Sequence, residues 1–209
     1  MKLILFSGFL GAGKTTAVLS ASRYLLLKMH AEGVDMESRE RVPLVILENE
    51  IGEIAYDEAL LRSGGLEVRN LLSGCICCTL TVDLILELRE IRDKYNPEYV
   101  IFEPSGAAFP DRILDTVSRS GVEPEWSLVV TIVDAHRFPK LMKVIPHLIE
   151  KQIAGANAVL ISKTDLIGPQ ETDQVLNEVK RINEKARVYI SPYGCPDADA
   201  LWEEVFDKR

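Results

Sequence analysis

Short runs of β-branched and other apolar residues alternate along the chain with longer segments whose apolar positions recur at helical spacing. The apolar runs predict strands near residues 2–7, 43–48, 98–103, 127–133, 157–162 and 187–191. Helices are predicted over 16–31, 81–95 and 197–208, and a polar loop over 32–43. Strands that alternate with helices are typical of a three-layer α/β fold, in which helices flank a mostly parallel central sheet. We expect one domain over residues 1–209.

Composition and charge exclude several classes of partner. The 209 residues are 47% hydrophobic and 27% charged, which is ordinary for a globular protein. Lys and Arg number 24 against 32 Asp and Glu, a net charge of −8, so a nucleic-acid partner is not expected. Apolar runs such as 126–133 are shorter than the roughly 20 residues that span a bilayer. Because the N-terminal apolar run also lacks a small-residue cleavage site, the sequence predicts a cytoplasmic protein without a membrane partner.

The segment GFLGAGKT (8–15) matches the pattern GxxxxGK[ST] of a phosphate-binding loop, the P-loop. It follows an apolar strand and precedes a helix, which is the required context. Gly8 and Gly13 let the backbone curl so that its N–H groups point at phosphate oxygens. We expect Lys14 to reach the β and γ phosphates and the Thr15 hydroxyl to bind Mg²⁺. The other predicted nucleotide contacts of this loop are Gly11, Ala12 and Thr16. An ordinary glycine turn is the alternative.

The segment YVIFEPSG (99–106) is an apolar strand that ends in one acidic residue, Glu103. A P-loop enzyme places a carboxylate at this position, facing Mg²⁺ or a water bound to it. Gly106 follows at a spacing that lets its N–H contact the γ phosphate. A solvated Glu at the end of a buried strand is the alternative.

The segment AVLISKTDL (158–166) places Lys163 and Asp165 after another predicted strand. The Asp165 carboxylate can accept both the N1–H and the 2-amino protons of guanine, while the Lys163 stem packs over the ring. This pattern favours GTP over ATP. The usual form of the motif begins with Asn, whereas this chain has Ser162, so we expect part of the loop's internal bonding to differ. The segment ISPYG (190–194), which includes Ser191, is expected to supply N–H groups to the base.

The segment GCICC (74–78) brings Cys75, Cys77 and Cys78 together. In a reducing compartment such a cluster indicates metal binding or redox chemistry rather than a disulfide framework. Three thiolates suit zinc, copper(I), cobalt or nickel and leave a fourth position open for transfer. Because neighbours on a strand face opposite sides, we expect the cluster on a turn that enters the helix at residue 79. A redox pair, or small buried hydrophobic residues, are the alternatives.

With these pieces in family order, the chain resembles the CobW/HypB/UreG family of P-loop GTPases, and most closely its CobW-like metallochaperone branch. The resemblance rests on the segments GFLGAGKTT, ENEIGE, GCICC, IFEPSG, TIVDAHRF and QIAGANAVLISKTDL. It implies a three-layer P-loop NTPase fold and a GTPase of low intrinsic turnover that loads or inserts a metal, or acts on a metal cofactor such as cobalamin. Larger members carry a further C-terminal domain, for which we expect no room in this chain.

The resemblance also implies that ENEIGE (48–53) is a nucleotide-sensing switch, with Glu48 or Glu50 near Mg²⁺. From the residues alone, an acidic strand end is equally a solvated edge. The predicted catalytic residues are Lys14, Glu103 and Glu50, and the absence of an evident arginine finger predicts slow turnover. The expected partners are GTP and GDP, a metal- or corrinoid-dependent client, and a second copy of the chain that would complete the three-thiol site.

Two other functions fit parts of the sequence. A nucleoside or nucleotide kinase also uses a P-loop, but it needs lid arginines and an acceptor pocket, and no such cluster is evident. A GTP-dependent docking module, in which the cysteines sense redox state or metal, is the principal alternative. The metal content of the protein with and without a GTP analogue distinguishes these functions.

Overall fold

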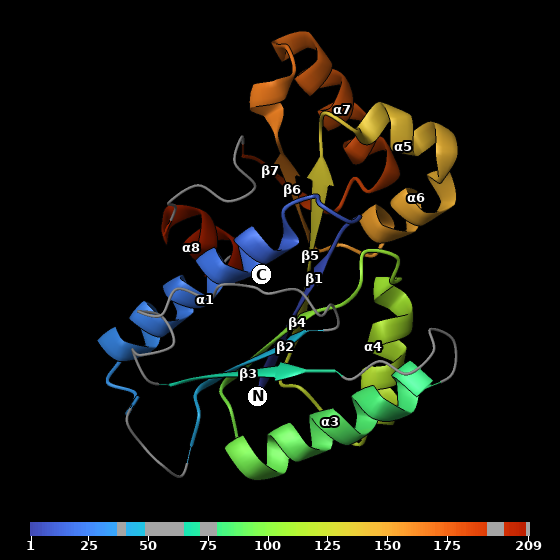
Figure 1. Ribbon diagram of the computed structural model, residues 1–209. Coiled ribbons are helices and arrows are strands. Elements are labelled where there is room, and N and C mark those ends of the chain that lie inside the picture. Colours follow the sequence, from blue (N-terminus) through green and yellow to red (C-terminus); the bar gives the residue numbers. More distant parts are fainter. Residues whose placement is uncertain (37–40, 49–64, 72–78, 192–198, 208–209) are drawn as a thin grey trace. The chain divides into compact units, whose positions relative to one another are not determined.

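The computed structural model describes residues 1–36, 41–48, 65–71, 79–191 and 199–207 (Figure 1). Its strands form a seven-stranded sheet in the order β3-β2-β4-β1-β5-β6-β7, and the registered pairs are parallel. The strands are β1 (Lys2–Ser7), β2 (Leu44–Glu48), β3 (Leu66–Asn70), β4 (Tyr99–Glu103), β5 (Ser127–Asp134), β6 (Ala158–Ser162) and β7 (Arg187–Ile190). The predicted three-layer α/β fold with a parallel central sheet is confirmed.

The described helices connect these strands. They are α1 (Lys14–Ala31), α3 (Thr79–Tyr95), α4 (Pro110–Arg119), α5 (Phe138–Val144), α6 (Pro146–Ala154), the short 3₁₀ turn η1 (Thr164–Leu166), α7 (Pro169–Ile182) and α8 (Asp199–Asp207). The helix expected just after the cysteines is α3, which begins at Thr79 as predicted. The closing helix is also confirmed, and the structure describes it over Asp199–Asp207.

Strand β3 is the element that the hydrophobic pattern missed. It has five residues, LEVRN, and none of them is fully buried. Two polar side chains of the strand bind α3 instead: Arg69 Nε donates to Glu87 Oε1 at 2.7 Å, and Tyr95 Oη donates to Glu67 Oε1 at 2.8 Å. Polar contacts that replace apolar burial leave no periodic signal in the sequence, which explains the omission.

The chain groups into two compact units, each made of several segments. The first contains Met1–Leu5, Ser22–Ser105 and Asp111–Ser127. The second contains Phe6–Ala21, Gly106–Pro110 and Leu128–Arg209. The single domain expected over the whole chain stays a prediction.

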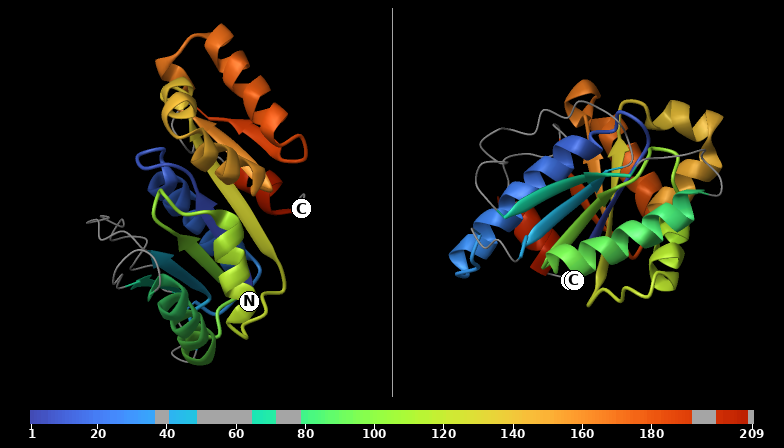
Figure 2. Two further views of the ribbon diagram at one scale, coloured as in Figure 1. Left: turned by 90° about the vertical axis from the view of Figure 1, so that its right-hand side faces the viewer. Right: turned by 60° about the horizontal axis from the view of Figure 1, so that its bottom comes forward.

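In the first unit, α3 and α4 lie on one face of β2, β3 and β4, and the C-terminal half of α1 lies on the other (Figures 1 and 2). Every residue of β2 and β4 is buried. Such strands read as continuous apolar runs because both faces are covered. Their last residues, Glu48 and Glu103, are therefore the point at which these strands turn from apolar to acidic.

In the second unit, α5, α6 and α7 cover one face of β5, β6 and β7, while α8 and the start of α1 lie on the other (Figure 1). Trp202 of α8 is fully buried there. It meets the Phe6 ring edge-on at 5.9 Å and stacks on Phe206 at 5.4 Å between centroids. Its Nε1–H donates to Ser20 Oγ at 2.9 Å. Trp202 therefore fastens α8 to α1 and to the strand that leads into the P-loop.

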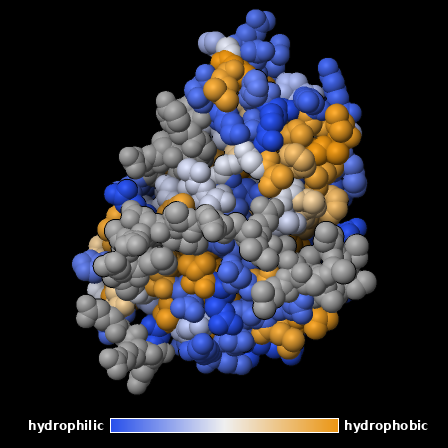
Figure 3. All heavy atoms as spheres, viewed as in Figure 1, coloured by the Kyte–Doolittle hydropathy of each residue, from blue (hydrophilic) through white to orange (hydrophobic). Residues whose placement is uncertain are grey.

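Apolar side chains that remain on the surface gather in patches. Figure 3 shows such a patch over α5 and α6, and Val144 at the end of α5 is 69% exposed. Among the described residues, no helix is long and apolar enough to cross a membrane.

We predict that Trp202→Ala lowers the free energy of unfolding by about 3–5 kcal/mol, since it removes a large buried side chain and leaves a cavity. Urea denaturation followed by circular dichroism measures this loss. Trp202→Phe is the matched control, because it keeps an aromatic ring in place and should cost clearly less. Equal losses for both variants would show that the indole hydrogen bond, rather than packing, dominates.

Candidate functional site

The P-loop joins the end of β1 to the start of α1 within the second unit. Its curl is present, since Gly8, Gly11 and Gly13 all have positive φ. At Gly8, with φ of 136°, an added Cβ would stand 2.4 Å from the Ile132 carbonyl oxygen, so only glycine fits. Lys14 opens the helix and is 4% exposed. The backbone form expected of a phosphate-binding loop is thus present, while the phosphate contacts stay predictions.

Three consecutive carbonyl groups of the P-loop each accept a hydrogen bond from a side chain outside the loop. In a trans peptide the C=O and N–H point in opposite directions, and the described chain has no cis peptide. Because these carbonyls are bonded from one side, the N–H groups of Gly11 and Gly13 point toward the opposite side, where an anion would bind. The Ala12 N–H instead donates to Phe9 O within the loop, at 3.1 Å. The three bonds are Arg137 Nη2 to Leu10 O (2.7 Å), Lys163 Nζ to Gly11 O (2.7 Å) and Ser162 Oγ to Ala12 O (2.8 Å).

The buried carboxylate of Asp134 holds two of these donors in place. Its side chain is 1% exposed, and its Oδ2 accepts from Arg137 Nε at 2.7 Å and from Lys163 Nζ at 2.8 Å. Its Oδ1 accepts from the Arg137 N–H at 3.0 Å. Burial by itself raises the pKa of Asp134, but the hydrogen bonds from Lys163 and Arg137 outweigh it and hold this pKa below its usual value. Asp134 is therefore ionised at neutral pH and fixes both cations.

The segment predicted to recognise the base also differs in detail from the sequence expectation. Lys163 has φ of 58°, and its ammonium group is engaged at Gly11 O and at Asp134. The packing of its partly exposed stem over a base stays a prediction. Ser162, which replaces the usual Asn, still reaches the P-loop through its hydroxyl. The Ser191 N–H donates to Ile161 O at 2.8 Å and so is not available to a base. Asp165 is exposed. Residues 192–194 lie outside the described residues.

Glu48 and Glu103 lie side by side in the first unit, as register partners on β2 and β4. They are 4% and 5% exposed. Burial and the neighbouring charge of Glu103 raise the pKa of Glu48 to about 7. Among the described residues, Glu48 Oε1 is buried without a hydrogen-bond partner. Two adjacent carboxylates of this kind suit a divalent cation such as Mg²⁺, which prefers oxygen ligands. Mg²⁺ binding by Glu48 and Glu103, and the participation of Thr15 in it, stay predictions.

Gly106 packs directly on the P-loop. A Cβ at this position would stand 2.5 Å from Leu10 N and 3.1 Å from Phe9 C, so its lack of a side chain permits the contact. The Gln152 side chain binds the carbonyl of Gly106 from the other side. The sequence analysis predicted a role for Gly106 but none for Gln152, Asp134 or Arg137. All three lie in the segments TIVDAHRF and QIAGANAVLISKTDL, which carried the family resemblance, so those segments were the available signal.

Several predicted residues lie outside the described part of the chain. They are Glu50, Cys75, Cys77 and Cys78, together with most of ENEIGE. Within the described residues, no group of three or more His, Cys, Asp or Glu side chains is arranged to hold a metal ion. The CxCC metal site therefore stays a prediction.

Comparison with known proteins agrees with this geometry. A family model described as the CobW/HypB/UreG nucleotide-binding domain matches residues 2–190. The zinc chaperone YjiA of Escherichia coli is 30% identical over 95% of this chain and 59% of its own length. The zinc chaperone CobW of a Sinorhizobium species is 30% identical over 83% of this chain and 53% of its own length. The chain thus spans little more than half the length of these curated relatives.

Solved structures share the fold at low identity. Zn(II)-bound YjiA GTPase from Escherichia coli superimposes with a TM-score of 0.61 at 23% identity, covering 90% of this chain and 57% of that chain. HypB from Helicobacter pylori in complex with nickel gives a TM-score of 0.55 at 14% identity, covering 99% and 87%. At these identities the likeness establishes the fold alone.

We predict that the raised pKa of Glu48 makes metal-free protein less stable as pH rises. The ordinary pKa of 4.5 applies when the chain is unfolded and about 7 when it is folded, so the folded state holds the extra proton between these values. Stability therefore falls from about pH 4.5 to about pH 7, by up to about 3 kcal/mol.

Glu48→Gln should abolish this fall, so that the variant matches the parent at pH 4.5 and exceeds it in stability at pH 8. Urea denaturation in EDTA across this range measures the difference. Glu123→Gln, at an exposed position, is the matched control for the loss of one carboxylate. Parallel curves for the parent and Glu48→Gln would contradict the prediction.

Proposed function

The chain belongs to the CobW/HypB/UreG family of nucleotide-binding domains, and from this premise we propose that it is a GTP-dependent metallochaperone. In this proposal the protein binds GTP with Mg²⁺, hydrolyses it slowly and uses the cycle to deliver a metal to a metal- or corrinoid-dependent client. The observation that carries the proposal concerns the P-loop. Each of its carbonyls at Leu10, Gly11 and Ala12 accepts a hydrogen bond from a side chain outside the loop. An ordinary glycine turn has no need of three such bonds.

Nucleotide binding follows from the residues around this loop. Inward N–H groups at the start of α1 suit phosphate oxygens, and the buried Lys14 supplies a positive charge beside them. Asp165 would accept the N1–H and 2-amino protons of guanine. Mg²⁺, held by the Thr15 hydroxyl and by Glu103 with Glu48, would neutralise charge on the phosphates.

The hydrogen bonds of Arg137 support slow turnover. Its guanidinium group lies beside the P-loop, but Nη2 and Nε are engaged by Leu10 O and by Asp134. A guanidinium fixed in this way positions the loop and is not directed at a transferring phosphoryl group. Full hydrolytic rate would then require a group from a client or from a second copy of the chain.

The proposed cargo site is the cluster of Cys75, Cys77 and Cys78, which precedes α3 in the sequence. Thiolates bind zinc well, and a three-sulfur site keeps one position open for an incoming ligand. Zinc is the first candidate because YjiA and CobW carry the name zinc chaperone. Cobalt or nickel would fit the same ligands, and the HypB neighbour is a nickel complex.

We predict that Asp165→Asn exchanges the base preference of the protein. The amide can donate to the 2-oxo group of xanthine, whereas it no longer accepts two guanine protons. Affinity for GDP should fall about ten- to a hundredfold, and affinity for XDP should rise, in competition against a fluorescent nucleotide. Asp173→Asn, at an exposed position on α7, is the matched control and should change neither affinity. An unaltered GDP affinity in Asp165→Asn would remove this residue from the base site.

We predict that protein purified without oxygen carries about one metal ion per chain and that its metal content responds to a GTP analogue. Replacing Cys75, Cys77 and Cys78 together by Ser should abolish this binding, as measured by elemental analysis. Cys195→Ser is the matched control and should retain the metal. Retention of metal by the triple variant would refute the cargo site, and absence of metal from all proteins would favour the docking module.

A further inference from the structure

The side chain of Gln152 is a buried polar contact that none of the roles above uses. Gln152 lies on α6 and is 2% exposed. Its Nε2 donates both of its protons, one to Gly106 O and one to Ala108 O, each at 3.1 Å. A side-chain amide buried in this way is costly unless it is paired, so the two carbonyls and the amide hold one another in place.

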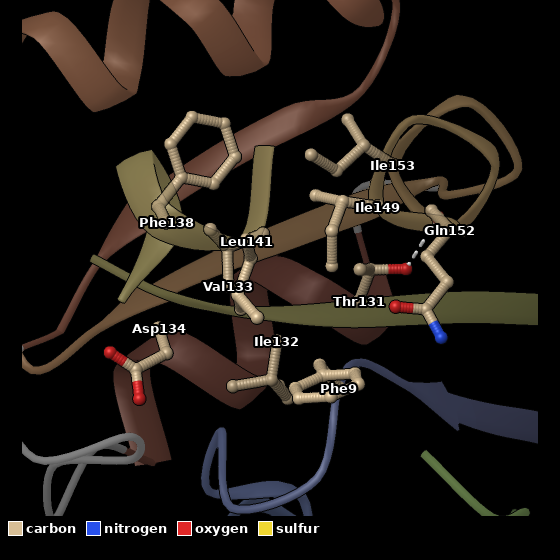
Figure 4. A pocket seen from close by; sticks show the side chains of 10 residues that line it. All are labelled: Phe9, Thr131, Ile132, Val133, Asp134, Phe138, Leu141, Ile149, Gln152 and Ile153. Carbon is tan, nitrogen blue, oxygen red and sulfur yellow. Dashed lines mark hydrogen bonds between the residues drawn. The ribbon is translucent and has the colours of Figure 1, made fainter. Parts of the chain in front are cut away.

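The helix that carries Gln152 is itself fixed on the sheet. Thr131 of β5, which is 1% exposed, donates its hydroxyl to the Gln152 carbonyl at 2.9 Å (Figure 4). The end of α6 is capped by Asn183, whose Nδ2 donates to Ile153 O at 2.8 Å and Ala156 O at 2.9 Å. Figure 4 also shows Phe9 of the P-loop lining the same pocket as Gln152. The Gln152 amide is therefore a fixed point close to the P-loop.

The segment 106–108 lies between this fixed point and the P-loop. On one side Gln152 binds its carbonyls, and on the other Gly106 packs against the backbone of Leu10. Because the Gly106 carbonyl is directed at Gln152, the N–H of the same peptide group, that of Ala107, points away from it. Ala107 is exposed. The Ala107 N–H is thus oriented by a side chain that would not touch a nucleotide.

We propose that Gln152 is a positioning residue for the γ phosphate. By holding the Gly106 carbonyl, it directs the Ala107 N–H so that it receives the γ phosphate of a nucleoside triphosphate, which a diphosphate lacks. This rests on the proposed function, in which the P-loop beside this turn binds a nucleoside triphosphate. Through Gln152, α6 raises the affinity of the protein for GTP relative to its affinity for GDP. Arg137, by contrast, supports the P-loop, which holds phosphates that both nucleotides share.

The test compares affinities for GDP and for a non-hydrolysable GTP analogue in Mg²⁺, measured by calorimetry on the full chain. Gln152→Leu removes both donors at similar volume, and Gln152→Met is a second variant of the same kind if the first fails to fold. Either variant should lower the affinity for the GTP analogue about tenfold and change the affinity for GDP less than about twofold. An unchanged ratio of the two affinities, including the case in which both fall by the same factor, would overturn the proposal.

Thr131→Val is the matched control for general disturbance of α6, because it removes a buried hydroxyl beside Gln152 and leaves the amide in place. It should lower the thermal midpoint without changing the ratio of the two affinities. Arg137→Ala should weaken both nucleotides by a similar factor. If the unmodified protein binds neither nucleotide, the proposed function fails; if it binds both and Gln152→Leu leaves the ratio unchanged, only the role of Gln152 fails.

Discussion

The arrangement of the second unit depends on one buried carboxylate, that of Asp134. It is ionised, nearly inaccessible to water and bonded to both Arg137 and Lys163. A charge in this position is tolerated only because both partners are present. The same two cations reach the P-loop carbonyls, so the pairing that stabilises the carboxylate also sets the direction of the loop. The N–H groups are thus oriented before any anion arrives, which reduces the reorganisation that binding requires.

Each unit holds buried or oriented polar groups whose charge a bound ligand of opposite charge would balance. The first unit brings Glu48 beside Glu103, where burial and like charge raise the pKa of Glu48. The second unit gathers inward N–H groups and the buried Lys14 at a helix N-terminus. A cation suits the first arrangement and an anion the second. Local conflicts of this kind are expected at functional sites rather than in a structural core.

Apolar runs predicted β1, β2, β4, β5 and β6 because these strands are almost entirely buried. The sixth predicted strand, β7, was found from its apolar residues although none of its residues is fully buried. The same reasoning missed β3, which is held to α3 by Arg69 and Glu67. Comparison with the usual motif, in turn, treated Ser162 only as a replacement for Asn. The structure shows that a hydroxyl is long enough to reach Ala12 O at 2.8 Å.

The sequence by itself determined the P-loop, the acidic strand ends and the order of the motifs, because each is a contiguous stretch whose chemistry depends on local spacing. The tertiary structure decided which distant side chains support that loop. Arg137 and Lys163 meet carbonyls 127 and 152 positions away, and Gln152 meets one 46 positions away. Such contacts depend on which strands become neighbours in the sheet and on how α6 is fastened to β5. No local pattern encodes those choices, since they arise from packing of the whole unit.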